Sequence, residues 1–113
     1  MKTISIWMSY DLGVGGDYQT LYQWLDDHGA VECGNSVAFL KYDYPDSIKS
    51  DDELTKSIAD ELKLKIKFNP SNRVYIIRRK LNENQFYGSY IIGKRRANPW
   101  QGYGSQADKT IDE

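Results

Sequence analysis

Residues 1–25, MKTISIWMSYDLGVGGDYQTLYQWL, contain a strand pattern, a glycine-rich turn and the beginning of a helix. Bulky Ile4, Ile6 and Met8 alternate with Ser5, Trp7 and Ser9. This period of two predicts a β-strand, and Trp7 on the second side favours a strand that is central in its sheet or covered on both faces. Asp11 stands where that strand ends, and much of what the sequence indicates about function depends on its carboxylate.

A helix is predicted directly after the glycine-rich turn. Asp17 is a good N-terminal cap because its carboxylate can accept hydrogen bonds from the first free amides. Tyr18, Leu21, Tyr22 and Leu25 then follow at helical spacing. Gly29 predicts the end of this helix.

The remaining elements are two short strands, a second helix and a hairpin. We expect a tight turn at Gly34-Asn35 between the two strands, and Pro45 to end the second strand. Ser50 and Glu53 form a capping box at the start of the second helix, which either runs to about Lys65 or gives way earlier to a strand. Residues 73–80 and 85–92 read as strands joined by a polar turn.

The order of these elements predicts an α+β domain. The first six match the βαββαβ unit of ferredoxin-like folds, an antiparallel sheet with two helices on one face, here with a C-terminal β-hairpin extension. We expect residues 1–104 to form a single domain, with Trp100 and Tyr103 holding part of its last segment, and residues 105–113 to be a flexible tail. A second subunit is the simplest cover for the other face of the sheet.

Composition places further bounds on the class of protein. The chain has 113 residues, of which 40% are apolar and 27% charged, as in ordinary globular domains. The net charge of −1 excludes a chain that binds nucleic acid through overall basicity. Without a signal peptide or a long apolar run, the chain is expected to be soluble and cytoplasmic, with no membrane contact. Its nine Tyr, three Trp and three Phe exceed the needs of a small core and indicate a contact surface.

Basic side chains are concentrated near the predicted hairpin. The set comprises Arg78, Arg79, Lys80, Lys94, Arg95 and Arg96. Both ends of the set are expected to lie together at the open end of the hairpin, with aromatic side chains nearby that can stack on bases. The alternatives are a solvated edge that blocks strand aggregation, or a surface that pairs with the acidic helix of a partner.

Three side chains are candidates for site chemistry. Asp11 either binds a hard cation through its carboxylate or caps the glycine-rich turn. His28, the single histidine, is either an acid–base group or a charge complement at the helix end. Cys33, the single cysteine, excludes an intrachain disulfide, and its predicted strand position indicates burial.

The N-terminal stretch resembles the Cas-two-like, or SinR-like, small proteins, which are similar to the CRISPR-associated adaptation subunit and to VapD-type toxins. The resemblance is carried by Tyr10, Asp11, Leu12, Asp17, Tyr18, Leu21 and Tyr22, and by the Trp-x-Gly-aromatic step in PWQGYG. It implies a ferredoxin-like homodimer in which two copies of Asp11 face each other and hold a divalent cation. Relatives are described as metal-dependent nucleases or as scaffolds for duplex DNA, and VapD-type toxins cleave RNA.

The resulting functional hypothesis is a nucleic-acid-processing or nucleic-acid-binding homodimer that acts on DNA or RNA. As an endonuclease it would use Asp11 as catalytic residue and ligand of Mg²⁺ or Mn²⁺, with Ser9 and Tyr10 shaping the site and the basic set holding the backbone. The alternative is a non-catalytic dimeric scaffold or a module that binds a protein partner. A single carboxylate per subunit favours this alternative, because it supplies few ligands for a metal ion.

Overall fold

The computed structural model describes residues 1–104, and the predicted tail at 105–113 lies outside them. The elements are β1 (Lys2–Asp11), α1 (Tyr18–Asp27), β2 (Val31–Gly34), β3 (Val37–Tyr44), α2 (Asp51–Lys65), β4 (Arg73–Arg79) and β5 (Phe86–Ile92). This is the predicted α+β order, with a β4–β5 hairpin where one was expected. Helix α2 takes the longer of the two predicted courses and ends at Lys65.

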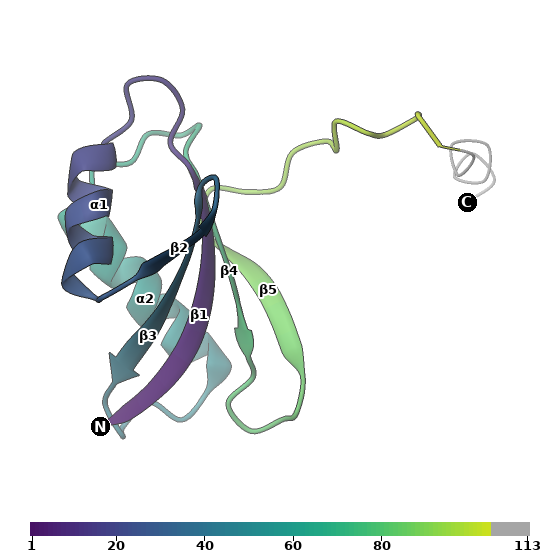
Figure 1. Ribbon diagram of the computed structural model, residues 1–113. Helices are drawn as coiled ribbons and strands as arrows, with labels where there is room; N and C mark the ends of the chain where they lie inside the picture. Colours follow the sequence, from purple (N-terminus) through teal and green to yellow (C-terminus); the bar gives the residue numbers. More distant parts are fainter. Residues whose placement is uncertain (105–113) are drawn as a thin grey trace.

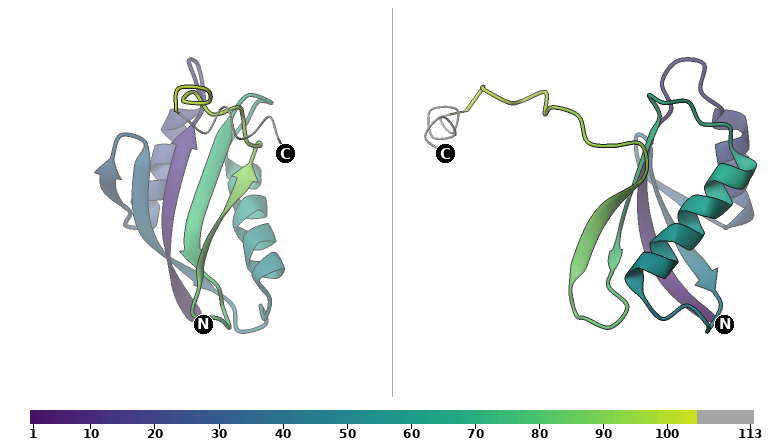
Figure 2. Two further views of the ribbon diagram at one scale, coloured as in Figure 1. Left: turned by 90° about the vertical axis from the view of Figure 1, so that its right-hand side faces the viewer. Right: turned by 180° about the vertical axis from the view of Figure 1, so that it is seen from behind.

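The strands form one five-stranded sheet in the order β2-β3-β1-β4-β5, with every neighbouring pair antiparallel. Strand β1 is central, as its pattern indicated. Both helices lie against the same side of the sheet (Figures 1 and 2). The fold is therefore α+β, and its fifth strand, β5 at one edge, takes it beyond the four-stranded sheet of the predicted ferredoxin-like unit.

The core lies between the sheet and the two helices. Alternate strand residues such as Ile6, Met8 and Ile76 are almost fully buried against apolar positions of α1 and α2, among them Leu21 and Ile58. Each such side chain contributes roughly 1.5–3 kcal/mol through the apolar surface that it removes from water. Within residues 1–104, no helix covers the other side of the sheet, and its outward side chains are available for contacts.

Both predicted helix caps are confirmed. The Asp17 carboxylate accepts hydrogen bonds from the Thr20 amide at 3.3 Å and the Thr20 hydroxyl at 2.8 Å. The Thr20 hydrogen bonds, together with the Lys67 amide, lower the pKa of Asp17. At α2, the Ser50 hydroxyl accepts the Glu53 amide at 3.1 Å and lies 3.0 Å from a Glu53 carboxylate oxygen.

Two predictions about loops are corrected. The turn between β2 and β3 is Asn35-Ser36, one residue later than predicted, because Gly34 still pairs with Val37 and Ser36 adopts a φ of 60°. After β5 the chain leads away from the sheet (Figure 1), so Trp100 and Tyr103 are 68% and 87% exposed and do not hold this segment against the sheet. Among residues 1–104, the helices are too short or too polar to span a bilayer.

Candidate functional site on the open face of the sheet

Strand residues that point away from the helices make up what we call the open face. They are Thr3, Ser5, Trp7, Ser9 and Asp11 of β1, Val37, Phe39, Lys41 and Asp43 of β3, Arg73, Tyr75, Ile77 and Arg79 of β4, and Phe86, Gly88 and Tyr90 of β5. Cross-strand neighbours share a face, so the register decides which of these side chains meet. The centre of the face is apolar, and both of its ends are polar.

A hollow of about 330 Å³ occupies the end of the open face that carries Ser9 and Asp11. We call it the polar hollow, and it is lined by Ser9, Asp11, Arg73, Tyr75, Tyr90 and Arg95. The predicted site residues Asp11 and Ser9 thus lie together with one predicted basic residue, Arg95. The lining comes from β1, β4, β5 and the segment after β5, which are far apart in the sequence.

Asp11 has two contacts in this hollow. One carboxylate oxygen accepts the Gly13 amide at 3.1 Å, which is the turn contact of the capping interpretation. The other accepts from the Arg73 guanidinium at 3.5 Å. The Asp11 side chain is 50% exposed, so this ion pair contributes at most about 1 kcal/mol.

The donor set does not fit a metal ion held by one copy of the chain. Asp11 is the one carboxylate that lines the polar hollow, and the adjacent Arg73 cation would repel a second positive charge. Among the described residues, no three His, Cys, Asp or Glu side chains are placed to share a metal ion. A divalent cation at Asp11 stays a prediction that requires ligands from elsewhere.

Aromatic side chains form the wall of the polar hollow opposite Asp11. The rings of Tyr75 and Tyr90 meet edge to face with centroids 4.7 Å apart, and the Arg95 guanidinium lies 5.7 Å from the Tyr90 ring centre. Tyr75 lies across Gly88, where a Cβ atom would come within 2.1 Å of the Tyr75 hydroxyl. The absence of a side chain at Gly88 therefore permits the observed position of Tyr75.

Arg73 and Tyr75 were not predicted as site residues. Alternation along β4 shows that they share a face, but only the pairing of Asp11 with Arg73 and of Ser9 with Tyr75 brings them to Asp11. Tyr10, predicted to shape the site, lies on the helix side of β1 instead, because adjacent strand residues face opposite ways. There it packs against Tyr18 and Tyr22, and burial and the neighbouring Tyr22 raise the pKa of Tyr10.

The basic residues do not gather at one end of the hairpin, contrary to prediction. Arg79 pairs with Phe86 beside the turn, whereas Val74 pairs with Ile92 at the other end. Lys80 therefore follows β4 at the turn, and Lys94, Arg95 and Arg96 follow β5 at the far end. Six residue steps of a strand separate the two groups by roughly 20 Å.

Arg78 is buried on the helix side and is 1% exposed. It donates to the Asp51 carboxylate at 2.7 Å, the Tyr87 hydroxyl at 2.6 Å and the Thr55 hydroxyl at 3.1 Å. Burial opposes the charge of Asp51, but the hydrogen bonds from Arg78 and the Leu81 amide outweigh it and lower the pKa of Asp51. Because these contacts enclose Arg78, its guanidinium is not accessible to a ligand on the open face.

The other predicted basic residues are accessible to different degrees. Arg79 donates to the Asn84 side chain, and Arg96 donates to the Ser71 carbonyl at 2.8 Å. Lys80 lies over the Tyr87 ring and 3.8 Å from Glu83. Lys94 is exposed. Of the predicted set, Arg95 is the member that enters a hollow on the open face with Asp11.

His28 and Cys33 take no part in the polar hollow. The Nδ1 atom of His28 donates to the Trp24 carbonyl at 2.7 Å, and its Nε2 atom lies 3.4 Å from the Glu61 carboxylate, so the side chain ties α1 to α2. Cys33 is exposed rather than buried, because β2 is an edge strand with an irregular register around this residue.

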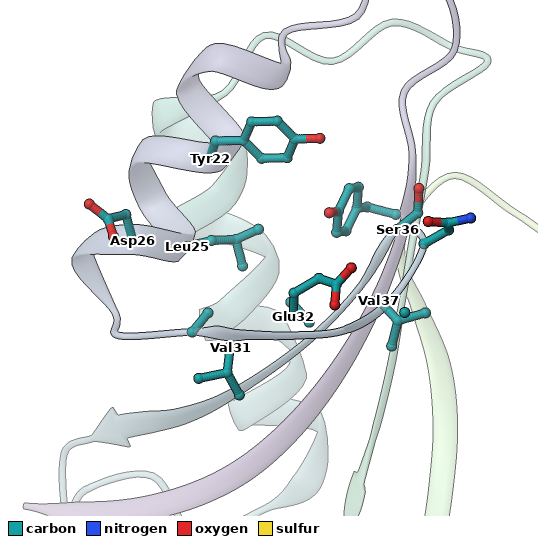
Figure 3. A pocket seen from close by; sticks show the side chains of 12 residues that line it. Tyr22, Leu25, Asp26, Val31, Glu32, Ser36 and Val37 are labelled. Atoms are coloured by element: carbon teal, nitrogen blue, oxygen red, sulfur yellow. The ribbon is translucent and has the colours of Figure 1, made fainter.

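A larger hollow of about 550 Å³ lies on the helix side, between α1 and the β2–β3 hairpin. Figure 3 shows Tyr22 extending into it from α1 and Glu32 from β2, whereas Asp26 points away. Its charged lining residues, Asp26 and Glu32, are acidic. It therefore does not suit the phosphate groups that the basic residues of the open face would attract.

Comparisons with protein-family models, curated proteins and solved structures returned no match for this chain. The class of protein that the structure defines is a small α+β domain with a five-stranded antiparallel sheet and two helices. Its function has to be inferred from the chemistry of the open face.

Proposed function

We propose that this chain is a nucleic-acid-binding protein of the ferredoxin-like, Cas-two-like type, and that its polar hollow holds the phosphate backbone. The observation that carries the proposal is the meeting of Arg73, Arg95 and Tyr90 with Ser9 and Asp11 in one hollow. Guanidinium groups bind phosphate oxygens through paired hydrogen bonds, and serine hydroxyls add further donors. The strand order β2-β3-β1-β4 and the placement of both helices on one side support the ferredoxin-like assignment.

The proposal includes a homodimer formed at the outer edge of β5. This edge strand, Phe86–Ile92, has the sequence FYGSYII and contains no charged residue or proline to block pairing. A second copy can extend the sheet there through backbone hydrogen bonds. Such pairing leaves the open face accessible and holds the two Asp11 residues at least five strand spacings, or roughly 24 Å, apart.

The second candidate is the metal-dependent endonuclease. It is favoured by one observation, the half-exposed Asp11 carboxylate at the end of strand β1. Here the open faces of two copies must pack against each other, since packed sheets lie about 10 Å apart and can bring two Asp11 residues together. This dimer covers the open face, so the two candidates exclude each other.

A binding titration tests the primary proposal. We expect Arg95→Gln to weaken binding of labelled DNA and RNA about fivefold to tenfold, and to reduce the slope of log K against log salt concentration by about one. Lys63→Gln on the outer surface of α2 is the matched control and should change neither. Equal salt slopes for wild type and Arg95→Gln would remove Arg95 and the polar hollow from the binding surface.

A cleavage assay separates the two candidates. Wild-type and Asp11→Asn proteins are mixed with labelled RNA and DNA in Mg²⁺, Mn²⁺ or EDTA. We expect no cleavage by either protein, and binding that survives in Asp11→Asn. Metal-dependent cleavage that the substitution abolishes would replace the binding proposal with the endonuclease, and binding of neither RNA nor DNA would favour a protein partner.

A further inference from the structure

An aromatic cluster occupies the centre of the open face, apart from the polar hollow. Trp7 of β1 pairs with Phe39 of β3, and their ring centroids lie 4.9 Å apart. Phe86 of β5 lies 6.4 Å from Trp7 on the other side. Trp7 is 37% exposed and Phe86 60% exposed, although neither is required by the core between sheet and helices.

We propose that this cluster stacks the unpaired bases of single-stranded RNA, which rests on the proposed function and names its substrate class. Aromatic rings on neighbouring strands of an open antiparallel sheet are well suited to stack successive bases. Duplex nucleic acid keeps its bases stacked internally and cannot offer them to a flat protein surface. The aromatic cluster therefore distinguishes single-stranded from duplex nucleic acid, whereas the polar hollow holds the phosphate backbone of both.

The charges around the cluster match a phosphate backbone. Basic Lys41, Arg73, Arg79 and Arg95 outnumber acidic Asp11 and Asp43 on the open face, and Asp11 is paired with Arg73. The basic residues lie on opposite sides of the cluster, since Arg79 is at the turn end of β4 and Arg73 at the other. A strand that crosses the face can thus have phosphates neutralised before and after the stacked bases.

The basic side chains on the open face also count against a second copy of the chain as the partner that covers this face. Two open faces packed together would bring basic side chains of one copy toward those of the other, which is unfavourable.

Hydroxyl groups beside the cluster favour RNA over DNA. Ser5 and Ser9 lie on the open face two residues to either side of Trp7. A hydroxyl can donate to and accept from a ribose 2′-hydroxyl, which DNA lacks. These serines are therefore placed to contact the sugars of bases that stack on Trp7.

Fluorescence anisotropy with a uridine-rich RNA strand, the DNA strand of matching sequence and the RNA duplex tests this inference. We expect the single-stranded RNA to bind at least tenfold more tightly than the duplex. Trp7→Ala should weaken single-strand binding about tenfold with duplex binding and the salt slope unchanged. Trp7→Phe, which keeps a stacking ring, should recover most of the loss, and Ile77→Ala is the control that removes an apolar side chain without a ring.

Each other outcome has a distinct meaning. Equal binding of RNA strand and duplex, unaffected by Trp7→Ala, would overturn the inference and leave the proposed function intact. Equal binding of the DNA strand would overturn the assignment to RNA. Binding of no nucleic acid would overturn both proposals. A change of sedimentation coefficient in folded Trp7→Phe or Trp7→Ala, with unchanged RNA affinity, would assign the cluster to a dimer interface instead.

Discussion

At the scale of single residues, Arg78 and Arg79 are adjacent in β4 but lie on opposite faces of the sheet. Arg78 shares the face of β4 that carries Val74 and Ile76, and it is buried in contacts with Asp51 and Tyr87. Arg79 lies on the open face. The alternation was readable from the sequence, because Arg78 falls at the positions occupied by buried apolar residues. The basic run therefore divides into one residue that holds the fold and one that is available for binding.

Removal of the Arg78 side chain should destabilise the fold strongly. Arg78→Ala leaves Asp51 partly buried without its cation, and we expect the free energy of unfolding to fall by about 3–5 kcal/mol. Arg79→Ala should change it by less than about 0.5 kcal/mol, as for exposed side chains. Urea unfolding monitored by circular dichroism measures both values, and equal losses would contradict the assignment of Arg78 to the fold.

The ion pair also predicts a response to acid. The pKa of Asp51 is lower in the folded chain than in the unfolded chain. Its contribution to stability is therefore present above the unfolded value of about 3.9 and is lost as the pH falls through the folded value. The Asp51→Asn variant should be less stable than wild type at neutral pH and should lose less stability on acidification. Thermal unfolding in buffers from about pH 2 to about pH 6 measures this difference. An acid response identical to wild type would contradict this.

Tyr42 predicts a response to base. It is 3% exposed, and burial, partly offset by a hydrogen bond with Ser57 and reinforced by Glu61, raises the pKa of Tyr42 to about 12. Its contribution is present below the unfolded value of about 10 and is lost as the pH rises through the folded value, with a total loss of about 3 kcal/mol. Tyrosinate absorbance should show a late component that is missing in Tyr42→Phe. Titration of all tyrosines together would argue against this burial.

At the scale of elements, local signals predicted where helices begin and end. Ser50 caps α2, and Ser50→Ala should lower the free energy of unfolding by about 1 kcal/mol because the Glu53 amide loses its acceptor. Ser47→Ala, at an exposed position in the preceding loop, is the control and should have little effect. Chemical denaturation measures the difference, and a loss shared by the control would contradict the cap.

Strand β5 contributes a residue without a side chain, Gly88, and the Tyr75 ring that lines the polar hollow lies against it. Gly88→Ala places a Cβ atom where the Tyr75 ring lies, and the ring can move because it is the far end of a side chain. We expect a folded protein with several-fold weaker nucleic-acid binding, since Tyr75 leaves Tyr90. Gly34→Ala, whose added Cβ meets no atom within 4 Å, serves as control. Unchanged nucleic-acid affinity in Gly88→Ala would show that the position of Tyr75 does not matter for the proposed binding.

At the scale of the whole molecule, the assembly decides which face is available. An edge-paired dimer predicts sedimentation as a dimer at micromolar concentration with Trp7 still accessible to a fluorescence quencher. A monomer would remove the dimer from the proposal. A dimer with protected Trp7 would instead support packing of the two open faces, and with it the endonuclease candidate.

The amino-acid sequence by itself determined the α+β class, the order of elements and both helix caps, because periodicity and capping depend on residues close together in the chain. Only the tertiary structure decided the site. Register is a long-range property, and it places Arg73 opposite Asp11 across a separation of 62 residues. It also separates the basic groups that were expected to meet. The polar hollow and the aromatic cluster exist because strand pairing, rather than any local motif, brings their side chains together.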